Sequence, residues 1–390
     1  MSPFVAYSLR LFAGRDSARG PGIVARLLEA IGQSFVRHRA MAVFVLLYLA
    51  AAMLVEWHLT GSVTGALYLY VALYLKIIPA MLGVMLFFYP LYIALVLRPA
   101  RPMTLLLQRL RDSVFTIDRI ATALPPLLLL PIFLNSFTVL KSAVGLVAPF
   151  RWDVRFEIAD RWLHGGEAPW RLLQPLLGEP RVSQIVTVFY VLWFLVLWFV
   201  LVWQIAGYHD RRLRAQFLGS MMACWSLLGT GAAMLFSSAG PCYFGRVTGL
   251  EDPYAPLMGY LREANASAEI WSLITQEKLW GYFTEGTVGL GGGISAMPSM
   301  HLSMAFLFVL LGWRVHRLIG LAALLYCVAI QIGSVHLGWH YAVDGYVSIA
   351  ATAAIWWAMG RILDRREAGL RAADPRPGPA SPNNPLGSRI

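Results

Sequence analysis

The sequence predicts an all-α membrane protein: a polytopic bundle of about eight spanning helices. Its 390 residues are 58% hydrophobic and only 14% charged, whereas a soluble domain of this length carries about 25% charged residues. Apolar runs near the length needed to cross a bilayer, about 20 residues, recur along the chain. Three cysteines, two of them inside apolar runs, do not form a disulfide framework.

Residues 1–40 form a charged N-terminal segment without the apolar core of a cleaved signal peptide. Val24, Leu27, Leu28 and Ile31 recur at helical spacing, which favours an amphipathic helix on the membrane surface. A frayed tail is the alternative. We expect this segment to be cytoplasmic.

Eight apolar runs follow, and each predicts a spanning helix. They cover residues 41–57, 72–97, 120–147, 182–206, 216–238, 301–313, 316–335 and 341–360. Pro125, Pro126 and Pro131 predict a kink in the third. We expect residues 41–118 to add two spans and a cytoplasmic loop to a catalytic core at 119–362, which includes a six-helix bundle. The proline-rich segment 363–390 is expected to be a disordered cytoplasmic tail.

The distribution of basic residues predicts the orientation. Most of the 32 Lys and Arg lie in segments that become cytoplasmic if both termini are cytoplasmic, and this bias fits an even number of spans. The net charge of +11 is spread over short clusters, so we assign it to topology and contacts with membrane lipids, with no nucleic-acid partner. Lys76, inside the second run, is expected to snorkel to the interface.

Two long segments then face away from the cytoplasm. Residues 148–181 interleave aromatic and charged side chains, as is typical of the headgroup level. Residues 239–300 form the longest hydrophilic excursion and are rich in Tyr and Trp. Because long ordered loops in compact proteins usually carry function, we expect this one to cap a site.

Three residues make a chemically complete set at this face. His340 and Asp344 are spaced one helical turn apart, so the carboxylate can fix the tautomer of the imidazole and leave its other nitrogen free to attack. His301 lies 39 residues earlier, which is one crossing and return, and supplies an acid for the leaving group. Gly293, Ser295 and Ser299 precede His301 and are candidates to bind an anion beside a helix N-terminus.

The stretches Ser295-Ala296-Met297-Pro298-Ser299-Met300-His301 and His340-Tyr341-Ala342-Val343-Asp344 resemble the second and third motifs of the type 2 phosphatidic acid phosphatase superfamily. They are most similar to its inositol phosphorylceramide synthase-like branch, which acts in sphingolipid metabolism. The resemblance implies that His340 forms a phosphohistidine, that Asp344 orients it, and that His301 protonates the departing oxygen. It implies no metal and no other cofactor.

The sequence departs from the superfamily pattern at two places. The first motif, Lys-x6-Arg-Pro, is absent, because Leu91 and Ala94 stand where Arg98-Pro99 and Arg101-Pro102 would require the lysine. Ser334 replaces the arginine of the third motif. Other groups must then neutralise the phosphate, and the candidates are Arg246 and Lys278 of the outer segment, together with Tyr341.

Several functions fit these residues. A phospholipid or other lipid phosphate is the expected substrate, with water as acceptor in a phosphatase and an alcohol as acceptor in a phosphotransferase. We favour headgroup transfer of the inositol phosphorylceramide synthase type. A transporter or scaffold on the same fold is an alternative from another class, and His336, His340 and Asp344 are an alternative metal-binding set. Donor, acceptor and oligomeric state stay open.

Overall fold

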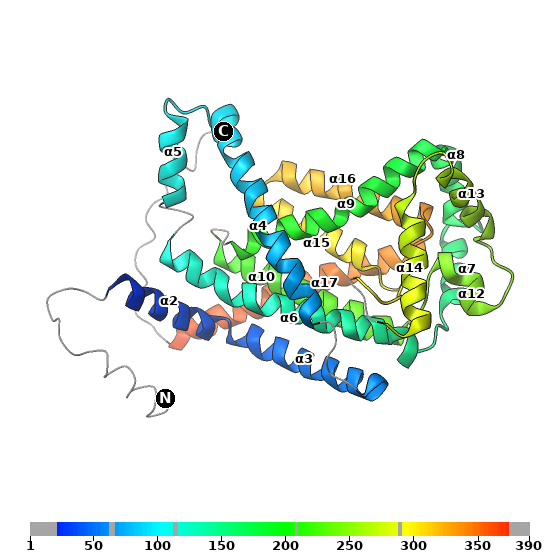
Figure 1. Cartoon of the computed structure of the whole chain (residues 1–390), viewed down its shortest axis with the longest axis horizontal. Helices are drawn as coiled ribbons and strands as arrows, with labels where there is room; N and C mark the ends of the chain where they lie inside the picture. The colour runs from blue at the N-terminus through cyan, green and yellow to red at the C-terminus, as the bar shows by residue number, and fades with distance from the viewer. Residues whose placement is uncertain (1–21, 62–66, 112–115, 207–209, 288–290, 374–390) are drawn as a thin grey trace.

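A computed structural model describes residues 22–61, 67–111, 116–206, 210–287 and 291–373 (Figure 1). The first 21 residues and the proline-rich tail from Asp374 lie outside the described residues, so their predicted features stay predictions. The longer helices are α2 (Ile23–Arg37), α3 (Arg39–Thr60), α4 (Leu67–Tyr92), α6 (Ile117–Val147), α9 (Pro180–Ile205), α10 (Arg211–Ala223), α15 (Met300–Val315), α16 (Arg317–His336) and α17 (Ala342–Ala373). Helix α4 continues into η1 (Ile93–Leu97), and α5 (Pro102–Arg109) follows; α10 continues through η3 (Cys224–Ala232) into α11 (Ala233–Leu235).

The predicted fold class is confirmed, because the described residues form helices without strands and all eight apolar runs are helical. Seven helical segments in the described ranges are long and apolar enough to cross a membrane. The remaining run, residues 301–313, is α15, which has 16 residues. Pro125, Pro126 and Pro131 lie inside α6, which remains one helix of 31 residues.

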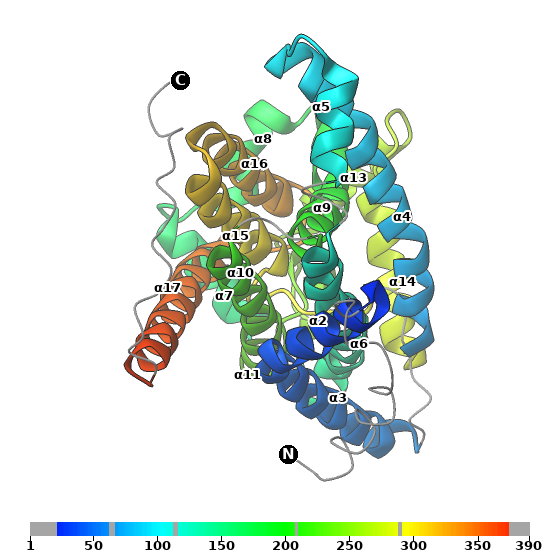
Figure 2. The ribbon, with the colours of Figure 1, turned by 90° about the vertical axis from the view of Figure 1, so that its left-hand side faces the viewer.

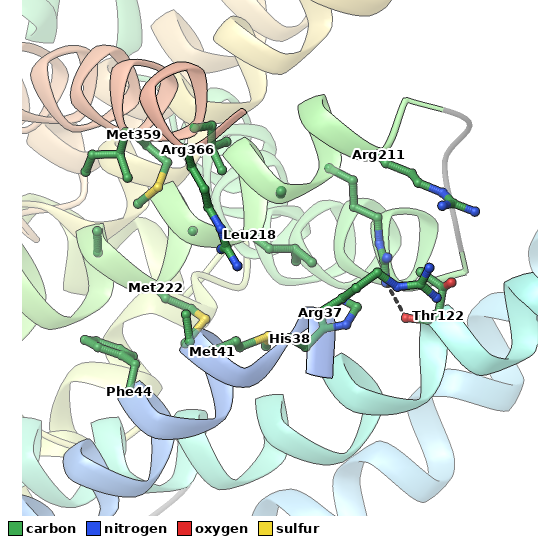
Figure 3. A pocket seen from close by; sticks show the side chains of 17 residues that line it. Arg37, His38, Met41, Phe44, Thr122, Arg211, Leu218, Met222, Met359 and Arg366 are labelled. Atoms are coloured by element: carbon green, nitrogen blue, oxygen red, sulfur yellow. Dashed lines mark hydrogen bonds between the residues drawn. The ribbon is translucent and has the colours of Figure 1, made fainter. Parts of the chain in front are cut away.

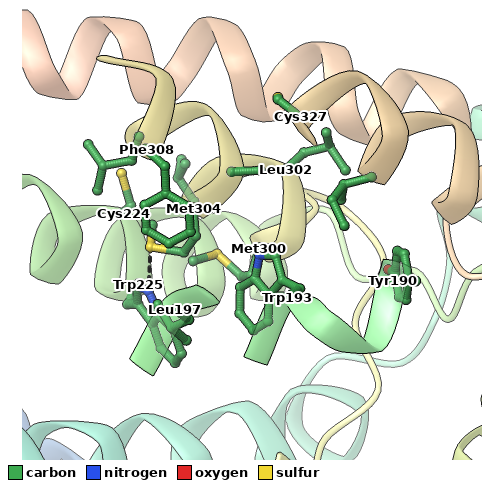
Figure 4. Close-up of a cluster of buried hydrophobic side chains, with 14 of the residues drawn as sticks. Tyr190, Trp193, Leu197, Cys224, Trp225, Met300, Leu302, Met304, Phe308 and Cys327 are labelled. Carbon is green, nitrogen blue, oxygen red and sulfur yellow. Dashed lines mark hydrogen bonds between the residues drawn. The ribbon is translucent and has the colours of Figure 1, made fainter. Parts of the chain in front are cut away.

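Helix α15 forms the centre of the bundle. Leu302, Met304 and Leu307 on it are fully buried, and Figure 4 shows Met304 beside Trp225 of η3 and Met300 beside Trp193 of α9. The indole Nε1 of Trp225 lies 3.0 Å from the sulfur of Met304. By contrast, α3 and α4 lie at the edge of the bundle, as Figure 2 shows, and most of their large apolar side chains are exposed, as lipid-facing helices require.

Helices α15 and α16 pack as a tight antiparallel hairpin. His316 separates them and its imidazole Nδ1 accepts a hydrogen bond from the amide of Leu318, so it caps α16. A Cβ on Gly312 would stand 3.0 Å from the backbone of Gly320, so the two helices approach more closely than larger residues allow. The hairpin returns the chain to the end of the bundle where His301 lies, as the 39-residue spacing predicts.

Short helices gather at that end: α7 (Asp153–Leu163), α8 (Pro169–Leu177), η4 (Pro241–Tyr243), α12 (Phe244–Thr248), α13 (Ala255–Asn265) and α14 (Trp271–Glu285). Figure 1 shows α7, α8, α12, α13 and α14 together at one side of the molecule. We call this side the histidine end, since it holds His301 and His340. The opposite side, with the end of α2, the start of α10 and the last turns of α17, is the arginine end.

The predicted start of the disordered tail, residue 363, is wrong for residues 363–373. Helix α17 continues to Ala373. Its last turns are charged and are held to α10 by ion pairs from Arg212 to Asp364 and Glu367. A charged sequence without an apolar face therefore remains helical because it extends a packed span.

Candidate active site

The backbone segment 296–301 and the segment 334–344 meet at the histidine end. The amide of Ser299 lies 3.5 Å from the carbonyl oxygen of Asp344, and the amides of Trp339 and His340 donate to the carbonyl of Ser334. These contacts bring the two sequence motifs side by side. They place the rings of His301 and His340 with their centroids 6.3 Å apart.

His340 lies just before α17, not on it as the spacing had suggested. Its Nδ1 is 2.9 Å from the carbonyl oxygen of Ala296 and 3.3 Å from Oδ2 of Asp344. Because a carbonyl only accepts, Nδ1 must carry the proton, and Nε2 then holds the free lone pair. Burial, together with the charge of Lys141, lowers the pKa of His340 to about 3. The hydrogen bond to Ala296 acts in the opposite direction. The imidazole is therefore neutral at physiological pH.

Asp344 holds the start of α17 as well as the ring of His340. Its side chain is fully buried, and Oδ2 also accepts a hydrogen bond from the amide of Tyr341 at 3.0 Å. Its other oxygen, Oδ1, has no hydrogen-bond partner within the described residues. The predicted contact between Asp344 and His340 is present, but the carbonyl of Ala296 is the nearer partner of Nδ1.

His301 stands in the first turn of α15, between two aromatic rings of α9. Its ring stacks on Tyr190 with a centroid separation of 4.6 Å, and Trp193 lies 4.3 Å away on a tilted plane. The indole of Trp193 donates to the carbonyl oxygen of His301 at 3.1 Å. Within the described ranges neither ring nitrogen of His301 has a hydrogen-bond partner, so both are available to a substrate.

Lys141, on α6, is a site residue that the sequence analysis missed. Its ammonium lies within electrostatic range of both His301 and His340, and the part of the chain that the structure describes offers it no ion-pair or hydrogen-bond partner. Gly293, at φ +90°, packs on the backbone of Lys141, where a Cβ would stand 2.6 Å from the carbonyl oxygen. Only glycine allows this close approach.

The sequence around Lys141 resembles a degenerate form of the Lys-x6-Arg-Pro pattern. The stretch from Lys141 to Ala148-Pro149 keeps the lysine, the spacing of six and the proline, with alanine in place of arginine. A search that requires the arginine overlooks it, and the lysine is also hidden in an apolar run. Ser334, which replaces the arginine of the third motif, is buried and donates to the carbonyl of Gln331.

Two buried aspartates of α7 position the segment around His340. Asp153 accepts hydrogen bonds from the hydroxyls of Ser238 and Tyr341 and from the amides of Ala239 and Gly240. Asp160 accepts from the amides of Ala342 and Val343 at 2.7 and 2.8 Å, so it caps α17 from outside. Burial raises the pKa of Asp160 to about 6, although these amides act against the shift.

The spacing of these two aspartates was a usable signal. They are seven residues apart, which is two helical turns and therefore one face. The sequence analysis had assigned the segment 148–181 to the membrane interface and gave neither residue a role.

Two predicted phosphate-binding residues have structural roles. Tyr341 is 1% exposed and its hydroxyl donates to Asp153 at 2.9 Å, so that hydroxyl is committed to the core. Ser299 is fully buried, and its hydroxyl accepts a hydrogen bond from the amide of Leu302 as the N-cap of α15. Both hydroxyls are therefore engaged within the protein, and the phosphate-binding roles of Tyr341 and Ser299 stay predictions.

The predicted outer-segment cations are engaged elsewhere. Arg246 forms a two-pronged ion pair with Glu277 and lies over the ring of Trp280. Lys278 is exposed and lies 5.6 Å from the ring centroid of Tyr282. Neither acts electrostatically on the histidines, as Lys141 does. Ser295 is half-buried beside Gly293 and, among the described residues, has no hydrogen-bond partner for its hydroxyl.

The alternative metal-binding set is not assembled. His336 is fully buried, and its Nε2 lies 2.8 Å from the hydroxyl of Ser183 on α9. In the described ranges, no three His, Cys, Asp or Glu side chains converge in a way that would hold a metal ion. His336 therefore packs against α9 and does not join His340 and Asp344.

An apolar cavity of about 480 Å³ has Phe194, a ring neighbour of His301, in its wall. It lies between α4, α6 and α9, and Gly291 lines it beside the glycine turn. Phe194 borders the cavity and also contacts the ring of His301, with centroids 6.0 Å apart. Leu134 lines the cavity from α6, seven residues before Lys141 and so on the same helical face. The cavity is therefore bordered by the lipid-facing helix α4 and, through Phe194, by a neighbour of His301.

Residues 157–358 match the family model described as the PAP2 superfamily. The matched range covers more than half of the 390 residues and contains His301, His340 and Asp344, but it begins after Lys141. Comparisons with curated proteins and with solved structures give no match.

Proposed function

The chain belongs to the PAP2 superfamily, and from this premise we propose that it transfers a phosphoryl-linked headgroup of a lipid through a covalent intermediate on His340. The observation that carries the proposal is the hydrogen bond from Nδ1 of His340 to the carbonyl of Ala296. It fixes the tautomer in which Nε2 is the nucleophile. We place the reaction at the non-cytoplasmic face, on the distribution of basic residues.

In the first half-reaction, Nε2 of His340 attacks the phosphorus and forms an N–P bond while the P–O bond to the lipid alcohol breaks. His301, in its protonated form, gives its proton to the departing oxygen. The imidazole of His340 becomes a cation when it is phosphorylated, and Asp344 beside it stabilises that charge. Lys141 neutralises charge on the phosphoryl oxygens.

In the second half-reaction, neutral His301 takes a proton from the acceptor hydroxyl. The acceptor oxygen forms a new bond to phosphorus and the N–P bond breaks, which returns His340 to its neutral form. An alcohol as acceptor gives a new phosphodiester, and water gives hydrolysis. The same residues serve both outcomes, so the acceptor must be chosen by the substrate cavity and not by the histidines.

The number of cations favours a phosphodiester substrate. The superfamily pattern has one lysine and two arginines, and this chain has Lys141 with Ala148 and Ser334 in the arginine positions. A phosphomonoester approaches two negative charges at neutral pH, because its second pKa is about 6, whereas a phosphodiester carries one. A site with one lysine matches the single charge better. This favours headgroup transfer over phosphatidate hydrolysis.

The apolar cavity beside Phe194 supports a lipid substrate. A chain that enters from α4 would lie along Leu134 and place its headgroup toward His301. Burying a chain there contributes about 0.8 kcal/mol per methylene group. The two additional N-terminal spans would then help to bind the substrate, since α4 forms one wall.

The test measures turnover by the purified protein in detergent. One assay offers phosphatidylinositol, a phosphodiester lipid, with ceramide or diacylglycerol as acceptor, and a parallel assay offers phosphatidate. We expect headgroup transfer to be the faster reaction and His340→Ala to lower it at least about 1,000-fold. His58→Ala, an exposed histidine of α3, is the matched control.

Three results would change the proposal. Faster release of phosphate from phosphatidate would favour the hydrolase. Equal rates for wild type and His340→Ala would exclude the phosphohistidine mechanism. Absence of turnover by folded wild-type protein across phosphodiesters and phosphomonoesters would favour a transporter or scaffold.

A further inference from the structure

A second cavity, of about 430 Å³, lies at the arginine end of the bundle. It is formed where the junction of α2 and α3 meets α6, α10 and α17 (Figure 3). Helix α17 shows how far this cavity lies from the active site. Asp344 and Arg366 are 22 residues apart on it, and at 1.5 Å per residue this is about 33 Å, close to the thickness of a bilayer core.

The polar lining of this cavity is strongly basic. Four arginines and His38 line it, and no Asp or Glu does. Arg214 is buried and donates only to the neutral carbonyls of Gln204, Thr122 and Ile205.

The other three arginines, Arg37, Arg211 and Arg366, make no hydrogen bond or ion pair within the described residues. The carboxylates that lie close to Arg211 and Arg366 in the sequence already have other partners. Asp364 and Glu367 pair with Arg212, which does not line the cavity, and Asp210 caps α10 through the amide of Leu213. The cavity therefore holds an excess of positive charge that the described side chains leave uncompensated.

The remainder of the cavity is apolar. Met222, Leu218 and Met359 line it together with Phe44. In Figure 3, Arg37, His38 and Arg211 lie toward one side of the cavity, and Met222 and Phe44 toward the other. A ligand that fits must therefore combine an anionic group with an apolar chain.

We propose that this cavity binds one anionic phospholipid of the leaflet opposite the active site. Its phosphate would lie beside Arg37 and Arg211, which are on the same side of the cavity, because guanidinium groups bind phosphate oxygens through paired N–H donors. An acyl chain would lie along Phe44 and Met222. A small inorganic anion would leave the apolar wall uncovered.

The chain's own ends do not fit this charge. Residues 1–21 contain three arginines and one aspartate, and residues 374–390 contain two arginines and one aspartate. Neither segment carries the negative charge that the cavity needs, whereas anionic lipids are abundant at a membrane surface. The lipid is therefore the occupant that the charges favour.

The test measures the thermal unfolding midpoint of the full-length protein in neutral detergent. Phosphatidylglycerol, phosphatidylcholine with the same chains, and inorganic phosphate are added separately. We expect phosphatidylglycerol to raise the midpoint by roughly 4 °C more than phosphatidylcholine does. The double variant Arg37→Gln with Arg211→Gln should lose this difference, and Ala215→Leu, which fills the cavity from α10, should reduce it.

The matched control is the double variant Arg181→Gln with Arg262→Gln, which removes the same charge from exposed positions at the histidine end and should keep the full difference. Equal responses to the two lipids, or a response to phosphate as large as that to phosphatidylglycerol, would overturn the proposal. Native mass spectrometry of the wild type with equal amounts of both lipids gives a test that needs no variant. Retention of one phosphatidylglycerol per chain is expected, and indiscriminate retention would contradict the site.

Discussion

Helix α17 connects two ends of the bundle whose charged side chains have different partners. At the histidine end, Asp153, Asp160 and Asp344 are at most 2% exposed. Each of them accepts at least one hydrogen bond from a backbone amide. At the arginine end, Arg37 and Arg211 face a cavity that contains no carboxylate. The carboxylates of the histidine end have partners within the protein, whereas Arg37 and Arg211 of the arginine end do not among the described residues.

This difference matches the two proposals, chemistry at the histidine end and retention of a ligand at the arginine end. A buried carboxylate is tolerated only when hydrogen bonds replace its water, and the bonds that satisfy Asp153 and Asp160 also fix the backbone around His340. Such fixed polar groups can stabilise a transition state without reorganising. Cations around an apolar cavity instead favour an anionic amphiphile that supplies the missing charge.

The two ends also use different cations. Lys141 presents a compact charge on a flexible stem, which can follow a phosphoryl group as it moves between His340 and an acceptor. The arginines of the other end have planar donor groups that suit a phosphate that stays in place.

Replacement of Lys141 by Met should have the largest effect. It removes the one basic side chain among the described residues that acts on both histidines, and we expect kcat/KM to fall about 100- to 1,000-fold. Lys141→Arg should recover only part of the activity, because a planar guanidinium does not reproduce the position of the ammonium. Steady-state kinetics on the lipid substrate measure both.

The comparison for Lys141 is Lys278→Met, which removes an exposed lysine that lies against Tyr282. It should cost far less activity. A larger loss from Lys278→Met than from Lys141→Met would return the phosphate-binding role to the outer segment, as the sequence had first suggested.

Asp344→Asn should lower kcat by about 30- to 100-fold. In serine hydrolases the equivalent change costs about 10⁴-fold because the histidine adopts the wrong tautomer. Here the carbonyl of Ala296 still fixes Nδ1–H, so only the stabilisation of the charged intermediate is lost. Single-turnover kinetics give the rate, and a loss near 10⁴-fold would mean that Asp344 alone sets the tautomer.

Replacement of Gly291 or Gly293 by alanine should have the smallest effects, and the two substitutions should differ in their cost. Gly291→Ala meets open space and costs only the strain of a positive φ, about 1–2 kcal/mol. Gly293→Ala also drives a Cβ to 2.6 Å from the carbonyl of Lys141, so its cost should be larger, about 3 kcal/mol, and it should displace the lysine. Thermal unfolding and activity of both variants check this. Equal losses would show that the glycine turn does not position Lys141.

The fold was predictable from the sequence because each membrane helix requires a long run of apolar residues. Each apolar run became a helix, and the spacing of His301 and His340 predicted that both lie at one end. The PAP2 superfamily was likewise recognised from its second and third motifs. The inositol phosphorylceramide synthase-like branch, the other domain boundaries and the membrane orientation stay predictions.

The parts of the site that escaped prediction depend on contacts between distant segments. From the sequence, the hydroxyl of Tyr341 is available to a ligand. In the structure it donates a hydrogen bond to Asp153, which is 188 residues away in the chain. Arg246 looked like a phosphate ligand until Glu277 was found beside it. Lys141 was hidden because lysine inside an apolar run suggests a membrane span before it suggests a site. Sequence patterns identify which groups can react, but not which of them are already engaged.

The most direct test of the account is to trap the covalent intermediate. The His301→Ala protein would be mixed with a phosphodiester that carries a labelled phosphate and a nitrophenyl leaving group, which needs no proton to depart. The account predicts burst release of nitrophenol, with label retained on the peptide that contains His340, stable in alkali and lost in acid. Label on another residue, or the same retained label in a protein that also carries His340→Ala, would contradict it.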